Sequence, residues 1–269
     1  MMAYNYRQIN YNVMSDTAQC CQTIPELMSA IDYSIANQYM VSEEENIDQP
    51  LVEAPHTLYI VSGKRSFEAA KTYRGKKVAV LNYANNHHIG GAPYSAGAQE
   101  ESLCRCSTLL PCLTAMDIPF YEKHRLMYKN RQMDFLGNDD LIYTPDVIVF
   151  KTDERTDPVF PQMMSRNEWY KVNVITCAAP QLMGIPILPD GYEDVIRSRI
   201  KKILDVAAME GNEVIILGAW GCGAFKNPIE IVARIFMELV KKYDFLVVEF
   251  ALASRDDVSN SAFARALKD

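Results

Sequence analysis

A short apolar run sets the fold class of this chain: Val78-Ala79-Val80-Leu81-Asn82-Tyr83. It follows the basic pair Lys76-Lys77 and predicts a buried strand. Further strands are predicted at His56–Val61, Asp146–Phe150, Val172–Cys177, Val214–Leu217 and Phe245–Phe250. Helical patterns separate them, at residues 66–71, 95–113, 120–135, 192–209, 228–241 and from 259 onward. This alternation predicts an α/β fold with a mostly parallel sheet covered by helices on both faces.

The first 50 residues have a different pattern. Residues 17–39 place Leu27, Ile31 and Ile35 at helical spacing, with a break at Pro25. Residues 1–16 are polar and are expected to be irregular, and residues 42–50 predict a solvated linker. We therefore expect residues 1–50 to form a helical extension that packs on one domain of residues 51–269.

Composition limits the function. The 269 residues include 27 basic and 34 acidic side chains, a net charge of −7, which argues against general or sequence-specific nucleic-acid binding. Seven cysteines without disulfide-scaffold or zinc-finger spacing suggest reduced thiols and no metal site. No apolar segment predicts a signal peptide or a membrane span. We expect a cytoplasmic protein without membrane contact; the oligomeric state stays open.

Two strand-to-helix loops are where an α/β sheet places its ligands. The first, Asn85–Pro93, contains Gly90-Gly91, which can adopt positive φ and approach a ligand closely. The next helix begins with Gln99-Glu100-Glu101. Taken alone, the same pattern fits a turn followed by acidic residues that favour a helix N-terminus.

The second loop is Gly221-Cys222-Gly223-Ala224-Phe225, directly before a predicted helix. Asn227 is expected to cap that helix, with Pro228 at its first position. Free backbone N–H groups at such a terminus suit a phosphate or diphosphate, although a tight structural turn is the alternative. Together the loops suggest a clamp around a phosphorylated ligand, with Phe225 and either Tyr83 or Tyr94 packed on a ribose or a base.

The neighbouring carboxylates Glu100 and Glu101 point about 100° apart on a helix. They are therefore poor candidates for the opposed pair of an ordinary glycosidase. A division of roles is more plausible, in which one carboxylate fixes ribose hydroxyls and the other acts as general acid and then base. Such an acid needs a raised pKa, which burial and a nearby like charge supply.

These motifs resemble the bacterial-type poly(ADP-ribose) glycohydrolases of the macrodomain superfamily. That family's signature is Gly-Gly-Gly followed, after about six to eight residues, by Gln-Glu-Glu, and here Gly90-Gly91-Ala92 precedes Gln99-Glu100-Glu101. The segments Leu81–Asn85, Leu103–Leu109, Val174–Pro180 and Gly218–Pro228 are also similar to the family. The resemblance extends from about residue 55 to the C-terminus.

The resemblance implies a macrodomain, a mixed sheet between helices, that hydrolyses ribose–ribose O-glycosidic bonds in poly(ADP-ribose) without a metal or cofactor. Its expected partners are ADP-ribose, the polymer and ADP-ribosylated proteins. Glu101 would be the catalytic acid and base, and Glu100 would position ribose hydroxyls. The implied ADP-ribose ligands are Asn85, Gly90, Gly91, Ala92, Gln99, Gly221, Cys222, Gly223, Ala224 and Phe225.

One position departs from the family motif. Ala92 carries a Cβ where the signature has glycine, and Pro93 stiffens the following backbone. Activity on the polymer could be lost at this site while ADP-ribose binding survives. Two alternatives therefore stay open: a module that binds ADP-ribose without turnover, and a hydrolase of mono-ADP-ribosyl groups.

Overall fold

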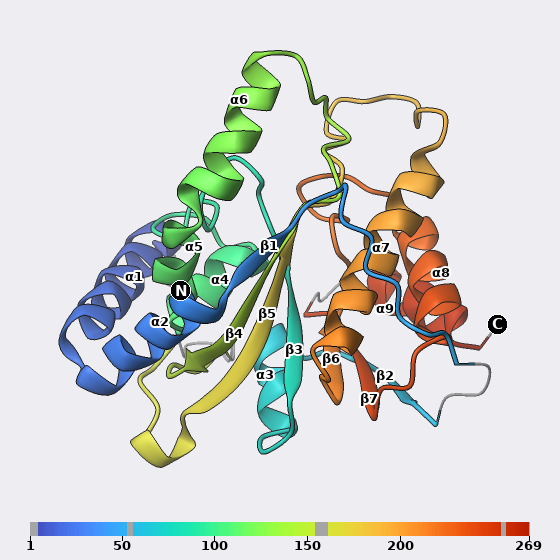
Figure 1. Ribbon diagram of the computed structural model, residues 1–269. Helices are drawn as coiled ribbons and strands as arrows, with labels where there is room; N and C mark the ends of the chain where they lie inside the picture. Colours follow the sequence, from blue (N-terminus) through green and yellow to red (C-terminus); the bar gives the residue numbers. More distant parts are fainter. Residues whose placement is uncertain (1–4, 53–55, 154–160, 254–256, 269) are drawn as a thin grey trace.

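The computed structural model describes residues 5–52, 56–153, 161–253 and 257–268 (Figure 1). The strands are β1 (Tyr39–Val41), β2 (Leu58–Ser62), β3 (Val78–Tyr83), β4 (Leu141–Val149), β5 (Tyr170–Cys177), β6 (Val214–Leu217) and β7 (Val247–Ala251). The α-helices are α1 (Tyr6–Thr23), α2 (Pro25–Asn37), α3 (Ser66–Thr72), α4 (Gln99–Cys106), α5 (Leu109–Ala115), α6 (Lys123–Lys129), α7 (Tyr192–Met209), α8 (Ile229–Val240) and α9 (Asp257–Ala266). A π-helical turn (Asp117–Glu122) leads into α6, and a 3₁₀ turn (Arg166–Glu168) precedes β5.

All the strands above belong to one sheet, in the order β1-β4-β5-β3-β6-β7-β2. The neighbours from β5 through β2 pair in parallel, whereas β4 is antiparallel to both β5 and β1. β3 lies at the centre, and every one of its residues except the last is buried. The predicted α/β class with a mixed, largely parallel sheet is therefore confirmed.

Helices cover both faces of this sheet, which makes three layers (Figure 1). Alternate side chains of β3 point to opposite layers, as its pleat requires. Ala79 and Leu81 pack with residues of α7, α8 and α9, whereas Val78 and Val80 pack with residues of α1 to α5. Because both faces of β3 are buried, its carboxyl end is held rigidly at the centre of the molecule.

The N-terminal segment differs from its prediction. Residues 6–16, expected to be irregular, form the first turns of α1, while residues 1–4 lie outside the described residues. Asn5 starts the helix, because its side chain accepts a hydrogen bond from the Gln8 amide at 3.2 Å. Met14, Thr17 and Cys21 are buried, so three inward-facing residues are enough to dock a polar helix.

Two helix predictions were too long. The stretch 95–113 is divided at Ser107, whose extended backbone pairs with Val149 of β4, so α4 and α5 are separate helices. The stretch 120–135 ends as α6 at Lys129. β1 was not predicted, although its three residues extend the sheet beyond β4. The predicted boundary at residue 50 stays a prediction.

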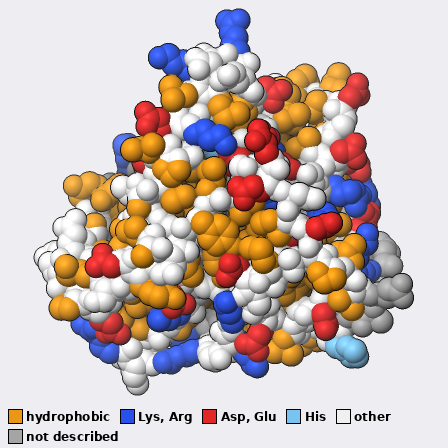
Figure 2. Space-filling model, viewed as in Figure 1, with side chains coloured by type: hydrophobic (Ala, Val, Ile, Leu, Met, Phe, Trp, Pro, Cys, Tyr) orange, Lys and Arg blue, Asp and Glu red, His pale blue; other side chains and the backbone are white. Residues whose placement is uncertain are grey.

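Charge is distributed over the surface. On the face shown in Figure 2, Lys and Arg side chains lie among Asp and Glu side chains and form no large basic patch. In the described part of the chain, no helix is both long and apolar enough to cross a membrane.

Candidate active site

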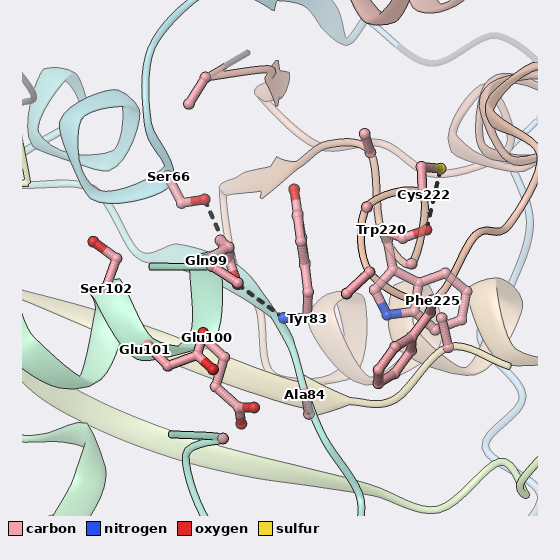
Figure 3. Close-up of a pocket in the computed structure, with 18 of the residues that line it drawn as sticks. Ser66, Tyr83, Ala84, Gln99, Glu100, Glu101, Ser102, Trp220, Cys222 and Phe225 are labelled. Atoms are coloured by element: carbon pink, nitrogen blue, oxygen red, sulfur yellow. Dashed lines mark hydrogen bonds between the residues drawn. The ribbon is translucent and has the colours of Figure 1, made fainter. Parts of the chain in front are cut away.

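A cavity of about 700 Å³ opens at the carboxyl ends of the parallel strands. Its walls come from residues that follow β2, β3, β5, β6 and β7, where an α/β sheet places its ligands. The volume falls within the range of small-molecule sites, roughly 300–1,000 Å³. Both predicted loops border it, and they lie on opposite sides of the end of β3 (Figure 3).

Gln99 fixes α4 to the end of β3. Its Oε1 accepts a hydrogen bond from the Tyr83 amide at 2.9 Å, and its Nε2 donates to the Leu81 carbonyl at 2.8 Å and to Ser66 Oγ at 3.0 Å (Figure 3). Gln99 was predicted as an ADP-ribose ligand. It borders the cavity, but these bonds use its whole amide group to orient the first turn of α4.

Glu100 is buried behind the first loop. Its Oε2 accepts a hydrogen bond from the Asn85 amide at 2.8 Å, and its Oε1 accepts one from Asn82 Nδ2 at 3.2 Å. Burial raises the pKa of Glu100 to about 8, because desolvation outweighs these two hydrogen bonds and the Glu101 carboxylate adds to the rise. Burial therefore favours the protonated, uncharged form of the Glu100 carboxyl.

Glu101 has one oxygen in use and one available. Its Oε1 accepts a hydrogen bond from the Ala92 amide at 3.1 Å. Its Oε2 is buried and has no hydrogen-bond partner among the described residues. A buried carboxylate oxygen without a partner is costly, and the cavity that Glu101 borders is where a substrate would supply that partner.

The two carboxylates converge on one glycine. Gly91 has φ +68°, and a Cβ there would collide with Glu101 Oε1 and lie 3.3 Å from Glu100 Oε2. Although the two side chains start from neighbouring positions on α4, both reach the same point of the loop. The expectation that they diverge by about 100° therefore holds for the helix positions but not for the carboxylates.

Gly90 and Ala92 have other roles in the loop. Gly90 is buried, and a Cβ there would lie within 3 Å of Leu110 and Cys104, so its absence allows the loop to pack on α4 and α5. Ala92 is exposed and does not have positive φ, so its Cβ causes no strain. Neither residue borders the cavity, although both were predicted to contact ADP-ribose.

Asn85 begins the first loop beside the cavity. Its Oδ1 accepts hydrogen bonds from the amides of His87 and His88 at 2.8 and 3.0 Å, which closes a tight turn. His87 then packs on Tyr128 of α6, with ring centroids 3.9 Å apart. The two histidines thus belong to the folded turn of the loop and do not line the cavity.

The second loop supplies the opposite wall. Five residues of this loop were predicted as ADP-ribose ligands, and all of them border the cavity: Gly221, Cys222, Gly223, Ala224 and Phe225. No side chain caps α8, which follows this loop, or α4 on the other side. Two helix N-termini with uncapped first turns therefore adjoin one cavity, and each favours an anion.

The predicted cap of α8 was wrong. Asn227 does not cap the helix, because Pro228 occupies the N-cap position. The Asn227 amide instead donates to the carbonyls of Pro180 and Gly221 at 2.8 and 3.0 Å, and its Oδ1 accepts from Tyr192 at 2.8 Å. Asn227 thus ties the second loop to the chain after β5 and to α7.

The aromatic residues divide between cavity and surface. Phe225 and Tyr83 border the cavity, whereas Tyr94 is exposed outside it. The Tyr94 ring packs on the Tyr11 ring of α1, with ring centroids 5.7 Å apart. Burial raises the pKa of the Cys222 thiol to about 12, which favours its uncharged form in the cavity wall.

Four polar residues that line the cavity were not predicted: Arg65, Ser66, Ser102 and Asp153. Arg65 pairs with Asp153 at 3.0 Å, Ser102 donates to Asp153 at 2.7 Å, and Arg65 also donates to Ser102. They come from three distant segments, so no local pattern joins them. The nearest signal was Ser102, which follows the predicted Glu101. Among the described residues that border the cavity, Arg65 is the one basic side chain.

A metal site needs several ligating side chains close together. Within residues 5–52, 56–153, 161–253 and 257–268, no group of three or more His, Cys, Asp or Glu side chains could hold a metal ion.

Comparison with known proteins gives a consistent picture. The family described as the catalytic domain of microbial-type poly(ADP-ribose) glycohydrolase (PARG) matches residues 17–152, just over half of the chain. No curated protein matches the chain significantly.

Solved structures match over nearly the whole chain. A PARG from Thermomonospora curvata, bound to the inhibitor ADP-HPD, is 28% identical with a TM-score of 0.80, and the match covers 96% of this chain and 98% of that one. A PARG from Deinococcus radiodurans in complex with ADP-ribose is 28% identical with a TM-score of 0.76, over 88% and 96% of the two chains.

Proposed function

This chain belongs to the family of microbial-type PARGs and is a glycosidase that acts on poly(ADP-ribose); we propose that Glu101 is the general acid and base of its reaction. The observation that carries the proposal is the unpartnered, buried Glu101 Oε2 at the cavity. The products would be ADP-ribose and a polymer shortened by one unit.

The reaction needs one proton donor at the bond that breaks. Protonated Glu101 gives its proton to the oxygen of the leaving ribose as the bond from that oxygen to the anomeric carbon breaks. The resulting carboxylate then takes a proton from the water that attacks the anomeric carbon. Water is thus divided between the two products, and the proton that Glu101 gave to the leaving ribose is returned to it.

Glu100 supports this step without a charge of its own. In its protonated state it adds no negative charge beside a substrate that already carries two phosphates. Its hydrogen bond from the Asn85 amide fixes the start of the first loop. We assign Glu100 and Asn85 to the ribose at the cleaved bond, as positioning groups for its hydroxyls.

The diphosphate is assigned to the second loop. Gly223 borders the cavity, and no described atom lies within 4 Å of a Cβ built on it, so this position has open space. Backbone N–H groups there, with the uncapped first turn of α8, would hold an anion in a protein whose net charge is −7. Phe225 would then pack against a ribose of the same ligand.

Labelled polymer tests the proposal directly. Native protein, Glu101→Ala and Glu101→Gln are incubated with it, and ADP-ribose release and calorimetric ADP-ribose binding are measured. Because the acid is removed and the cavity is kept, both variants should lose at least about 10³-fold in kcat and still bind ADP-ribose. Full activity in either variant would show that Glu101 is not the acid.

The same assay separates the alternatives. Binding without release by native protein would indicate a module that only recognises ADP-ribose. Release of ADP-ribose from mono-ADP-ribosylated protein but not from polymer would indicate a hydrolase of mono-ADP-ribosyl groups. We also propose ADP-ribosylated proteins as the carriers of the polymer and the cytoplasm as the location, and both remain predictions.

A further inference from the structure

The loop between Gly91 and α4 has no regular structure, yet it holds the proposed acid. Ala92 donates its amide hydrogen to Glu101 Oε1 at 3.1 Å. The Ala92 carbonyl, in turn, accepts hydrogen bonds from the amides of Ser95 and Ala96, both at 2.9 Å. The position of the Ala92 amide therefore depends on where Ser95 and Ala96 are held.

Helix α1 holds those two residues from outside the loop. Asn10 Nδ2 donates to the carbonyl of Ser95 at 3.1 Å and to the carbonyl of Ala96 at 3.0 Å. A continuous chain of hydrogen bonds thus runs from Asn10 through Ser95 and Ala96 to Ala92 and on to Glu101. Tyr11, next to Asn10, adds a ring contact with Tyr94.

Arg105 also binds this loop, but from a different helix than Asn10. Its Nη1 donates to the carbonyls of Pro93 and Ala96, each at 2.7 Å. Arg105 belongs to α4, the helix that carries Glu101, so it ties the loop to its own neighbour. Asn10 comes from a separate helix and gives the loop an independent fixed point.

Helix α1 is itself firmly docked. Thr17 Oγ1 donates to the Arg105 carbonyl at 2.6 Å, and Lys151 Nζ donates to Thr17 Oγ1 at 2.7 Å and pairs with Asp16 at 2.6 Å. Met14 of the same helix is buried at 1% exposure. These contacts do not involve Asn10, so replacing Asn10 should leave the helix in place.

We propose that Asn10 is a positioning residue for the glycosidase reaction: it fixes the loop so that the Ala92 amide holds Glu101 toward the bond to be cleaved. This inference rests on the proposed role of Glu101. It gives the N-terminal helix a function in the reaction, besides its packing on the sheet.

Two substitutions of Asn10 test it. Asn10→Ala removes both donors, and Asn10→Asp keeps the shape but places a carboxylate against two carbonyls. We expect kcat on polymer to fall about ten-fold or more in each, since an acid that is no longer held in place loses rate rather than binding. The affinity for ADP-ribose should change less than about three-fold, because Gly91 is held separately by the His88 carbonyl at 3.0 Å.

Asn12→Ala is the matched control. Asn12 lies on the same helix and is exposed, and among the described residues its side chain accepts a hydrogen bond only from Gln8. It should keep the native kcat. All rates are measured at least about 15 °C below the melting temperature of each variant, so that unfolded protein does not contribute.

The outcomes separate this inference from the proposed function. An active Glu101→Ala protein would overturn the role of Glu101, and the inference with it. An inactive Glu101→Ala protein together with native kcat in Asn10→Asp would overturn the inference alone. A loss in Asn10→Ala that follows the fraction unfolded, or an equal loss in Asn12→Ala, would show that Asn10 is only structural.

Discussion

Gly91 and Ala92 are neighbours, but the structure accommodates a Cβ only at position 92. Gly91 has φ +68°, and a Cβ there would collide with Glu101 Oε1, whereas the Ala92 side chain is exposed and unstrained. The concern that Ala92 weakens the site therefore has no structural basis in the loop as it stands. What the site requires of Ala92 is its amide hydrogen, which alanine and glycine share.

Gly91→Ala should abolish most of the activity, and Ala92→Gly should not. In Gly91→Ala the new methyl group forces Glu101 away from its position, so we expect kcat/KM on polymer to fall at least about 100-fold. In Ala92→Gly it should stay within about three-fold of native, since only loop entropy changes. Initial rates of ADP-ribose release measure both. A native rate in Gly91→Ala would refute the geometry described for the carboxylates.

Glu100 makes stability depend on pH. Its pKa in the folded protein is raised, mainly by burial, to about 8 from the ordinary value of 4.5. The sign follows from linkage: its contribution to stability is fully present below about pH 4.5 and is lost as pH rises through about 8. Glutamine resembles the protonated carboxyl, and Asn82 Oδ1, buried without a partner, can accept from it once the Asn82 amide turns.

Glu100→Gln should therefore gain stability relative to native protein as pH rises from 5 to 9. Urea unfolding at each pH gives the difference in unfolding free energy, and the comparison cancels groups that both proteins share. Glu44→Gln, at an exposed position, is the control and should give a flat difference. Parallel native and Glu100→Gln curves would mean that Glu100 titrates normally.

At the scale of elements, sequence patterns identified the strands and loops whose signal lies within a few consecutive residues. β3 and β6 are apolar runs followed by glycine-rich loops, so both walls of the cavity could be predicted. β1 has only three residues, too few for a pattern, and is recognised only by its pairing with β4. The first turns of α1 are polar, because they dock through Met14 and hydrogen bonds rather than through an apolar stripe.

Polar networks between elements could not be predicted at all. Arg65, Ser102 and Asp153 meet at the cavity from three segments. Asn10 binds the loop between Gly91 and α4, at a residue 85 positions later in the sequence. Asn227 looked like a helix cap because Asn before Pro has that pattern, but its amide bridges two loops instead. Side-chain partners of this kind are set by tertiary structure.

The loop between β6 and α8 offers a matched pair of glycines. Gly221 has φ +71°, and a Cβ there would collide with Ala179 and lie 2.6 Å from Asn227 Nδ2, whereas Gly223 has open space and no positive φ. Gly221→Ala should therefore lower the unfolding free energy by about 1–3 kcal/mol. Gly223→Ala should leave it unchanged but weaken ADP-ribose binding at least about ten-fold, because the methyl group occupies space assigned to the diphosphate.

Thermal unfolding and calorimetry distinguish the two effects. Native stability with weakened binding in Gly223→Ala would support a diphosphate beside this loop. Native affinity in Gly223→Ala would place the diphosphate elsewhere. Equal destabilisation in both variants would show that the loop is a structural turn at each glycine.

At the scale of the whole molecule, the protein and its substrate both carry negative charge. The net charge is −7, basic and acidic side chains are mixed on the face shown in Figure 2, and Arg65 is the one basic residue among the described residues at the cavity. Poly(ADP-ribose) carries two phosphates in every unit. Long-range repulsion should therefore slow the encounter, and recognition should depend on short-range contacts within the cavity.

Salt should consequently raise kcat/KM on long polymer, by about two- to three-fold between roughly 20 and 150 mM NaCl, because screening weakens repulsion beyond about 8–10 Å. A protein that binds a polyanion through a basic face behaves in the opposite way, since salt reduces its counterion release and its affinity falls steeply. Initial rates at low substrate concentration, with unfolding curves at each salt concentration as the control, measure the slope. A steep fall would reveal a basic contact surface that the distribution of charge does not show, and a rise would place the specificity of the enzyme in the cavity beside Glu101.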